Sequence, residues 1–331
     1  MLSVTNMAER YGIAVAGSVI LDKIKEIPAY PSIGELAKIS SVKYAIGGCV
    51  PNVALDIKRM RADMDVKALG RIGEDGEGKY VIDHLTEGGV DTSLFITMKD
   101  ELTSFTDVMS IVGGQRTFFN YPGAADAFGF EDIDFSKLNV KILHLGYFLL
   151  LKRIDEGDGI KILDAATKCG IKTSIDLVSE NSDRYSIVLP TLPYTDYLII
   201  NELEAGKLTG IEPTDENMPT IAKKLLSLGV REKVIIHMPK YAIAASSEGV
   251  TVVPSYDIPK EAIKGTTGAG DAFCAGALIG IYDGRCDREI LEFASAAAAV
   301  SLFEADATSG LKSEVEIKDI CKNFAKRKLD F

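Results

Sequence analysis

The sequence predicts an α/β fold: a three-layer αβα sandwich with a mostly parallel central sheet and a small inserted β-sheet. Three observations support this prediction. Short, continuously apolar segments alternate with amphipathic helical segments, and such strands are typical of a parallel sheet that is covered on both faces. The end of the chain is helical in pattern. Two stretches interrupt the alternation with strand-like patterns of their own.

The apolar segments predict the strands of the central sheet. Each is short, is rich in valine, isoleucine and leucine, and precedes a segment with helical periodicity. The predicted strands are Gly12–Val19, Val66–Leu69, Ile142–Leu145, Thr173–Leu177, Tyr197–Ile200 and Lys233–His237.

The segments between and after these strands predict helices, because their apolar residues recur at helical spacing. They are Asn52–Arg61, Gly78–Glu87, Gly157–Cys169, Glu202–Thr209, Asn217–Leu228, Asp271–Tyr282, Arg288–Glu304 and Val315–Arg327.

Two stretches, 22–46 and 93–122, lack helical periodicity. The second contains the strand-like runs Ser104–Val112 and Gln115–Tyr121, joined by Gly113-Gly114, which indicates a hairpin. Extra β segments in an α/β body suit a lid over a ligand site, although a peripheral decoration would give the same pattern. We expect a single domain over residues 1–331, with a lid formed by these two segments.

Composition narrows the class of protein. The chain has 331 residues and a net charge of −11, which argues against nucleic acid or an anionic membrane as partner. It has no apolar run of membrane-spanning length, and Met1–Tyr11 lacks the apolar core of a signal peptide. The 5 cysteines are scattered without a CxxC pair, which makes a disulfide framework or a zinc site an unfavoured prediction. We expect a reduced, cytoplasmic protein.

The segment Gly265–Asp271 (GTTGAGD) carries the densest chemistry. Its glycines allow close approach to a ligand, and the N–H groups at the start of the following helix favour an anion. Asp271, in the first turn of that helix, can accept the proton of an attacking hydroxyl, or it can simply complement the helix dipole. The segment is neither a Walker loop nor a dinucleotide fingerprint, because its residues and spacing differ from both.

The run Thr267–Phe273 resembles the C-terminal signature of the ribokinase-like (PfkB) carbohydrate kinase family. Four further motifs of that family occur in the expected order along nearly the whole chain. They are Ala16–Ser18 with Asp22, Gly47-Gly48 with Asn52–Ala54, the set Gly70, Gly73, Asp75 and Gly78, and Asn201–Ala205.

The resemblance implies a role for each motif. Asp271 would be the catalytic base, and the N–H groups of Gly268, Ala269 and Gly270 would form the anion hole. ATP and Mg²⁺ would be the cofactors, with Mg²⁺ held by Asn201 and Glu204 through water. The remaining candidates are Asp22, Gly47, Gly48, Asn52 and Arg116 for the substrate, and Asn201, Glu204, Thr266, Thr267 and Ser295 for the nucleotide.

Local chemistry leaves alternatives open for several of these residues. Asn52 can simply cap its helix, and Glu204 can lie on a solvated helix face. Arg116 can pack on the lid instead of closing over a substrate or phosphate. Asp22 can be a loop residue, and Gly47-Gly48 can be a turn. His144, Tyr147 and Asp176 end core strands, where ligands bind in open α/β sheets, although His144 can equally be a core residue.

The chain departs from the family pattern at four places. Gly265 stands where relatives often have an aspartate that helps to bind a monovalent cation, so potassium dependence is open. Cys49–Pro51 replaces the Lys-Gly-Ala that is typical of ribokinase. Met238–Lys240 stands where relatives often have a glycine-rich nucleotide loop, and Ser295 where they often have asparagine.

These observations predict ATP-dependent phosphorylation of a hydroxyl of a small sugar or sugar-like substrate. The alternatives are a nucleoside kinase of the same superfamily and a non-catalytic sugar-sensing protein that retains the fold. We also expect a homodimer formed through the lid, because its strands present an edge that a second copy can cover.

Overall fold

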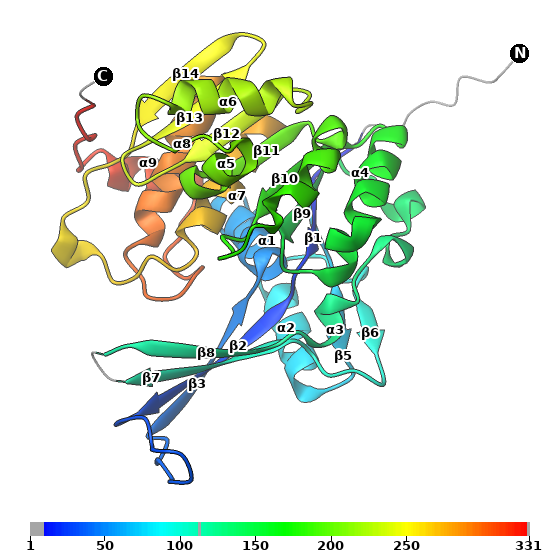
Figure 1. Ribbon diagram of the computed structural model, residues 1–331, viewed down its shortest axis with the longest axis vertical. Helices are drawn as coiled ribbons and strands as arrows, with labels where there is room; N and C mark the ends of the chain where they lie inside the picture. Colours follow the sequence, from blue (N-terminus) through cyan, green and yellow to red (C-terminus); the bar gives the residue numbers. More distant parts are fainter. Residues whose placement is uncertain (1–9, 112–113, 330–331) are drawn as a thin grey trace, which may run out of the picture.

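The computed structural model describes residues 10–111 and 114–329 (Figure 1). Its central sheet has the strand order β14-β13-β12-β11-β10-β9-β1-β4. Neighbouring strands from β12 to β4 are parallel, and the pairs β12–β13 and β13–β14 are antiparallel. The predicted α/β fold with a mostly parallel sheet is confirmed. Gly113 of the predicted hairpin turn, and most of the segment Met1–Tyr11, lie outside the described residues.

All six predicted strands are present in this sheet, with ends that differ by a few residues. The hairpin of β13 and β14 was not predicted, because half of β13 is alanine, which carries little strand preference. The bounds are β1 Ile13–Gly17, β4 Val66–Leu69, β9 Ile142–Phe148, β10 Lys172–Leu177, β11 Tyr197–Asn201, β12 Lys233–His237, β13 Tyr241–Ser246 and β14 Gly249–Pro254.

The predicted helices are also present. The main helices are α1 Cys49–Met60, α2 Gly76–Glu87, α3 Gly123–Asp126, α4 Gly159–Lys168, α5 Glu202–Thr209, α6 Met218–Ser227, α7 Ala269–Tyr282, α8 Asp287–Ser301 and α9 Glu314–Cys321. A π-helical turn, Ile154–Asp158, precedes α4, and the 3-10 turns are Phe130–Asp132, Phe135–Lys137, Arg184–Tyr194 and Lys260–Ala262.

Two helix boundaries correct the sequence-based expectation. Helix α1 begins at Cys49, so Asn52 lies inside the helix and is not its cap. Helix α9 ends at Cys321, six residues before the predicted end at Arg327. The first correction matters for the site, because the side chain of Asn52 is free to contact another element.

Helices cover both faces of the central sheet (Figure 1). Along β1, Ile13 and Val15 join the core shared with α1, α7 and α8, whereas Ala14 and Ala16 join the core shared with α4, α5 and α6. Successive strand residues point to opposite faces, so a strand buried on both sides is apolar throughout. This packing explains the continuous apolar runs in the sequence. Among the described residues, no helix is long and apolar enough to cross a lipid bilayer.

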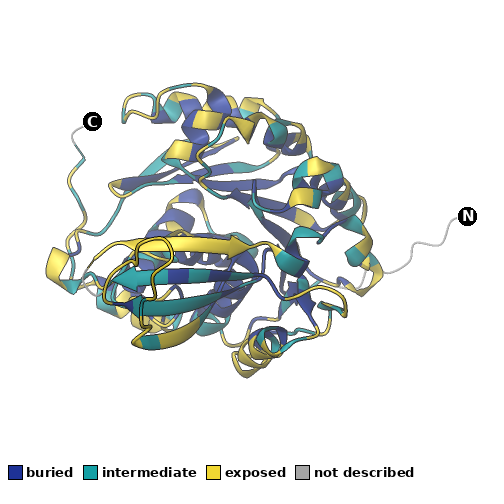
Figure 2. Ribbon diagram, turned by 60° about the horizontal axis from the view of Figure 1, so that its bottom comes forward, coloured by how far each residue is buried: buried dark blue, intermediate teal, exposed yellow. Residues whose placement is uncertain are grey.

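A second, four-stranded sheet projects from the body in the order β3-β2-β7-β8 (Figure 1). Its last strand, β8, is exposed along its whole length, as Figure 2 shows. The small inserted sheet is therefore confirmed. The start of the stretch 93–122 is not part of it, because β6 pairs with β5 beside the body. The bounds are β2 Ile20–Ile27, β3 Ser41–Gly47, β7 Phe105–Ile111, β8 Arg116–Tyr121, β5 Arg71–Gly73 and β6 Ile96–Met98.

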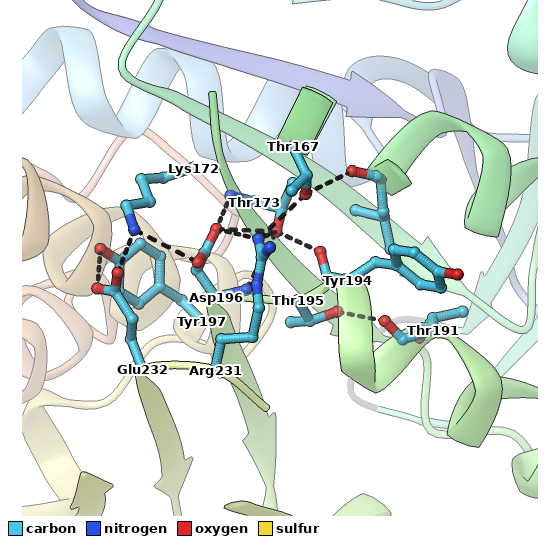
Figure 3. Close-up of polar contacts among 11 residues, drawn as sticks. Thr167, Lys172, Thr173, Thr191, Tyr194, Thr195, Asp196, Tyr197, Arg231 and Glu232 are labelled. Atoms are coloured by element: carbon cyan, nitrogen blue, oxygen red, sulfur yellow. Dashed lines mark hydrogen bonds and ion pairs between the residues drawn. The ribbon is translucent and has the colours of Figure 1, made fainter. Parts of the chain in front are cut away.

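A buried polar network ties together the amino ends of β10, β11 and β12 (Figure 3). Asp196 is 2% exposed, and its carboxylate accepts hydrogen bonds from Thr173 N at 2.8 Å and from Arg231 Nη2 at 2.7 Å. We expect Asp196→Ala to lower the free energy of unfolding by about 2–4 kcal/mol, because it leaves buried donors without an acceptor.

Urea unfolding of this variant tests the expectation. The matched control is Asp164→Ala, which removes a surface ion pair with Lys168 and should cost less than about 0.5 kcal/mol. Equal losses for the two variants would show that the network does not hold the strands.

Candidate active site

The glycine-rich segment forms a sharp turn into α7 at the carboxyl edge of the central sheet. Gly268 lies just before the helix with φ 79°, and a Cβ there would lie 2.5 Å from Ala307 O. Only glycine fits this position without a shift of the backbone. The first N–H groups of α7 lack helical partners, as an anion hole requires, although Ala269 N donates to Thr266 O at 3.3 Å.

Asp271 lies in the first turn of α7, as predicted, and its side chain is buried. Asn52 Nδ2 of α1 donates to its Oδ2 at 2.9 Å, and the Tyr147 hydroxyl of β9 donates to both carboxylate oxygens at 3.0 and 3.1 Å. Burial, aided by the negative charge of Asp176, raises the pKa of Asp271 to about 7. The carboxylate is thus suited to accept a proton near neutral pH.

Tyr147 reaches Asp271 through an unusual backbone conformation. Its φ of 62° lies in the left-handed region, which non-glycine residues rarely adopt and which is often found at functional sites. The Tyr147 N–H donates to Asp176 Oδ1 at 2.5 Å, and this bond joins the carboxyl ends of β9 and β10. The arrangement aims the phenol at the candidate base.

Four of the five predicted substrate residues lie close to one another, and one of them, Asn52, contacts Asp271. Asp22 of β2 is close to the Gly47 backbone, since a Cβ on Gly47 would lie 3.0 Å from Asp22 Oδ2. Gly48, with φ 88°, opens α1, and Asn52 follows one turn later. Asn52 Oδ1 is buried and has no hydrogen-bond partner among the described residues. Burial raises the pKa of Asp22.

Arg116 is not brought to this group. It pairs with Ser110 in the β7–β8 ladder, four residues along β7 from Thr106, the partner of Asp22. Its side chain is exposed near the outer end of the hairpin. Strand β8 begins at Arg116 and reaches the body only at its other end. On β8, the residue level with Asp22 is Asn120. It pairs with Thr106, and its Nδ2 lies 3.2 Å from Thr106 Oγ1.

A cavity of about 370 Å³ lies against Asp271. Its described lining includes the carboxyl groups of Asp176, Glu204 and Asp271 and contains no lysine or arginine. Carboxylates that converge without a basic side chain favour a bound cation. The acidic lining therefore favours a cation in this cavity.

Asn201 and Glu204 also line this cavity, at the start of α5. Asn201 caps the helix, and Glu204 Oε2 accepts a hydrogen bond from Asn201 N at 3.0 Å. Glu204 Oε1 accepts from Ser179 Oγ at 2.8 Å, and burial raises the pKa of Glu204 to about 7. Glu204 is buried, so it does not lie on a solvated helix face. Because both its oxygens are engaged, contact with Mg²⁺ through water fits better than direct ligation.

A second, more apolar cavity of about 500 Å³ adjoins the first, and both are lined by Asn201, His237 and Gly270. Thr266 lines the second cavity, as does Ser295, whose buried Oγ has no partner among the described residues. Thr267 is exposed and lines neither cavity. The further apolar lining includes Met238, Pro239, Ile258, Ile263, Phe273, Ala298 and Leu302.

Close packing around Gly265 leaves little room for an acidic side chain at this position. A Cβ there would lie 3.0 Å from both Cα and O of Ala305. The loop before α7 packs against the backbone of 304–307 so closely that a larger residue would require that backbone to move.

His237 is a site residue that the sequence analysis did not single out. It ends β12 between the two cavities, and burial lowers its pKa to about 4, so the imidazole is neutral. Its position could have indicated a role, because it is the last residue of a predicted strand, and ligands bind at the carboxyl ends of strands in α/β sheets. His144 is buried in the core, with Nδ1 3.0 Å from Ser174 Oγ.

A buried carboxylate, a glycine turn at a helix start and two adjoining cavities lie together in this α/β fold, an arrangement that suits an anionic ligand beside a small polar one. Residues 12–314 match the model of the pfkB family carbohydrate kinases, and the chain belongs to this family.

Curated relatives and solved structures agree with this assignment. A ribokinase from Arabidopsis thaliana is 28% identical over 293 residues, which cover 87% of this chain and 75% of the relative. A 2-dehydro-3-deoxygluconokinase from Escherichia coli K12 is 25% identical over 258 residues, covering 73% of this chain and 82% of the relative. The structure of an Arabidopsis thaliana ribokinase complexed with ribose and ATP has a TM-score of 0.81 and 24% identity, and the match covers 95% of this chain and 99% of that one.

Proposed function

We propose that the protein transfers the γ-phosphoryl group of ATP to a hydroxyl of a small sugar or sugar-like substrate. The observation that carries this proposal is the position of Asp271. Its buried carboxylate lies at the start of α7, next to Gly270, where the polar and the apolar cavity meet. A proton acceptor and an anion-binding helix start thus stand side by side, as phosphoryl transfer requires.

Each group has a part in this reaction. The substrate hydroxyl approaches Asp271, which takes its proton, while Asn52 and Asp22 bind neighbouring hydroxyls. The N–H groups at Gly268–Gly270 stabilise the charge on the transferred phosphoryl group. The second sheet acts as a lid that excludes water, a competing acceptor. Mg²⁺ held through water by Asn201 and Glu204 would neutralise phosphate charge, and the acidic lining of the first cavity fits such an ion.

The substrate class is tested by ADP production with ATP, Mg²⁺ and a panel of ribose, fructose, a 2-keto-3-deoxy sugar acid and adenosine. We expect turnover with a sugar, and ribose is the first candidate because ribokinases are among the relatives. A clear preference for adenosine would instead establish the nucleoside kinase alternative.

The non-catalytic alternative makes a different prediction. Met238–Lys240 stands where many relatives have a glycine-rich nucleotide loop. If this difference abolished ATP binding, the chain would be only a sugar-binding protein. Calorimetry with Mg²⁺ and ATP separates the two. Binding of ATP supports the kinase, and its absence while a sugar still binds supports the sensor.

Removal of the Tyr147 hydroxyl should shift the pH dependence of kcat/KM. The hydroxyl donates to the Asp271 carboxylate and so lowers the pKa of that group. Tyr147→Phe should therefore raise this pKa by roughly 0.4–1.1, the equivalent of one hydrogen bond. Because the base acts when deprotonated, the acidic limb of the profile moves to higher pH.

The matched control is Tyr197→Phe, which removes a hydroxyl bonded to Glu232 at the other end of the sheet. Its profile should coincide with that of the unaltered enzyme. If the acidic limb of the Tyr147→Phe profile stayed at the same pH or moved to lower pH, the proposed role of the phenol would be contradicted.

We further propose that two copies associate through the lid. The edge strands β3 and β8 of the second sheet expose Tyr44, Phe118 and Phe119, the last two at 62% and 58% exposure. Exposed apolar side chains on an edge strand are typical of a covered surface. Light scattering should give twice the chain mass of 35.7 kDa, and Phe118→Asp should give the monomer. A monomeric unaltered protein would remove this proposal.

A further inference from the structure

Three side chains gather near Asp271, and only one of them, Asp176, lines the polar cavity. They are Cys49 at the start of α1, His144 on β9 and Asp176 on β10, and all three are buried. Their ligand atoms lie within 4.8 Å of one another. Thiolate, imidazole and carboxylate are the groups that bind Zn²⁺ in proteins.

The spacing of these atoms suits a single ion. Three points within 4.8 Å of one another share a centre that is at most about 2.8 Å from each. Bond lengths to zinc are about 2.3 Å for sulfur and about 2.0–2.2 Å for nitrogen and oxygen, so shifts of up to about 0.5–0.8 Å complete the site. Such shifts lie within the range of side-chain rotation.

The neighbours of the cluster orient its ligand atoms. Ser174 Oγ lies 3.0 Å from His144 Nδ1, which leaves Nε2 to face the cluster. This Nε2 is 3.5 Å from Asp176 Oδ2 and 3.6 Å from Cys274 Sγ. The Tyr147 N–H occupies the other oxygen of Asp176. In metal sites, a ligating histidine or carboxylate typically has a further hydrogen-bond partner that fixes its orientation.

The charge balance also favours a cation. Among the described residues, Asp176 has no lysine or arginine within ion-pair distance, and His144 is its sole partner of that kind. A buried carboxylate without a compensating positive charge is costly. Asp176 and Cys274 also line the polar cavity, which gives an ion a path from solvent.

We propose that Cys49, His144 and Asp176 bind one divalent transition-metal ion of the zinc class, with Cys274 beside its fourth position. A zinc site was not expected from the sequence, because it has no local cysteine–histidine pattern. The fold assembles the ligands from three distant elements instead, a juxtaposition that local spacing cannot show.

The ion would position the groups that hold the catalytic base. Cys49 lies one turn before Asn52 on α1, and Asp176 holds the backbone of Tyr147. Asn52 and Tyr147 are the two side chains bonded to Asp271. A metal that fastens β9 and β10 to α1 therefore fixes both partners of Asp271, and its binding releases the Cys49 thiol proton to solvent.

Cobalt substitution of the full-length protein tests the site without reference to kinase activity. The protein is stripped with a chelator and titrated with Co²⁺ in the absence of nucleotide. We expect one equivalent to bind, with a near-ultraviolet thiolate-to-cobalt charge-transfer band that Zn²⁺ abolishes. Cys49→Ala should lose the band, whereas Cys169→Ala, which alters an exposed cysteine, should keep it.

Zinc X-ray absorption of the unaltered protein covers the case in which Cys49→Ala does not fold. A first shell with sulfur together with nitrogen or oxygen supports the site. A shell of oxygen alone, no stoichiometric zinc, or an undiminished cobalt band in folded Cys49→Ala would overturn the proposal.

Discussion

Replacing Asp271 with asparagine should reduce kcat for sugar phosphorylation by about 10²–10⁴-fold, the usual contribution of a general base. The amide has nearly the shape of the carboxylate, so it can retain the contact with the Tyr147 hydroxyl while it loses the ability to take a proton. The KM values for ATP and sugar should change much less than kcat. Steady-state kinetics with the sugar selected by the substrate panel gives both quantities.

The same substitution should stabilise the protein at neutral to alkaline pH. Because the fold raises the pKa of Asp271 to about 7 from its ordinary value of 3.8, the folded state favours the protonated group. The stability that this group contributes is present at acid pH and is lost as pH rises from about 4 through about 7. Asparagine is neutral throughout, so the melting temperature of Asp271→Asn should exceed that of the unaltered protein at about pH 8 but not at about pH 4.

Asp283→Asn is the control for both effects. Asp283 lies at the other end of α7 in ion pairs with Arg61 and Arg285, away from the cavities. Its kcat should stay near that of the unaltered enzyme. If Asp271→Asn kept comparable turnover, the carboxylate would not be the base.

Gly268→Ala should reduce kcat/KM by about 10²–10³-fold, the scale for the loss of an anion-hole donor. The added Cβ would lie 2.5 Å from Ala307 O, and the left-handed φ of 79° is unfavourable for alanine. The turn must therefore move, and the N–H groups that follow it move with it. Kinetics on the folded variant measures the effect.

Gly210→Ala is the matched control for backbone strain. Gly210 has a similar φ of 67°, but a Cβ there meets nothing within 4 Å, and the residue ends α5 away from the glycine turn. We expect a loss of about 1 kcal/mol in stability and near-normal activity. Near-normal activity in Gly268→Ala as well would show that the turn does not bind the phosphoryl group.

Much of the fold could be predicted, because buried parallel strands leave a local signal in continuous apolar runs. Val66–Leu69 and Lys233–His237 have the predicted bounds. The alanine-rich strand Tyr241–Ser246 was missed because its pairing depends on β12 and β14 and not on its own composition. The start of α1 at Cys49 was missed because no capping side chain marks it.

The structure brings together several of the residues that the motifs indicated, but not Arg116 or Thr267, and the sequence did not indicate the contacts among them. Motifs placed Asn52 and Asp271 at one site, and the structure joins them by a hydrogen bond across 219 residues of sequence. The bond from Tyr147 depends on a backbone conformation that no motif encodes. The remote position of Arg116 follows from the strand register, and the cluster of Cys49 with His144 follows from packing between a helix and a strand.

A crystal structure with a non-hydrolysable ATP analogue, Mg²⁺ and the sugar selected by the substrate panel tests the central claim most directly. We predict the terminal phosphate at the N–H groups of Gly268–Gly270 and a sugar hydroxyl within hydrogen-bond distance of the Asp271 carboxylate, in line with that phosphate. A terminal phosphate bound elsewhere, or a bound sugar with no hydroxyl near Asp271, would contradict it.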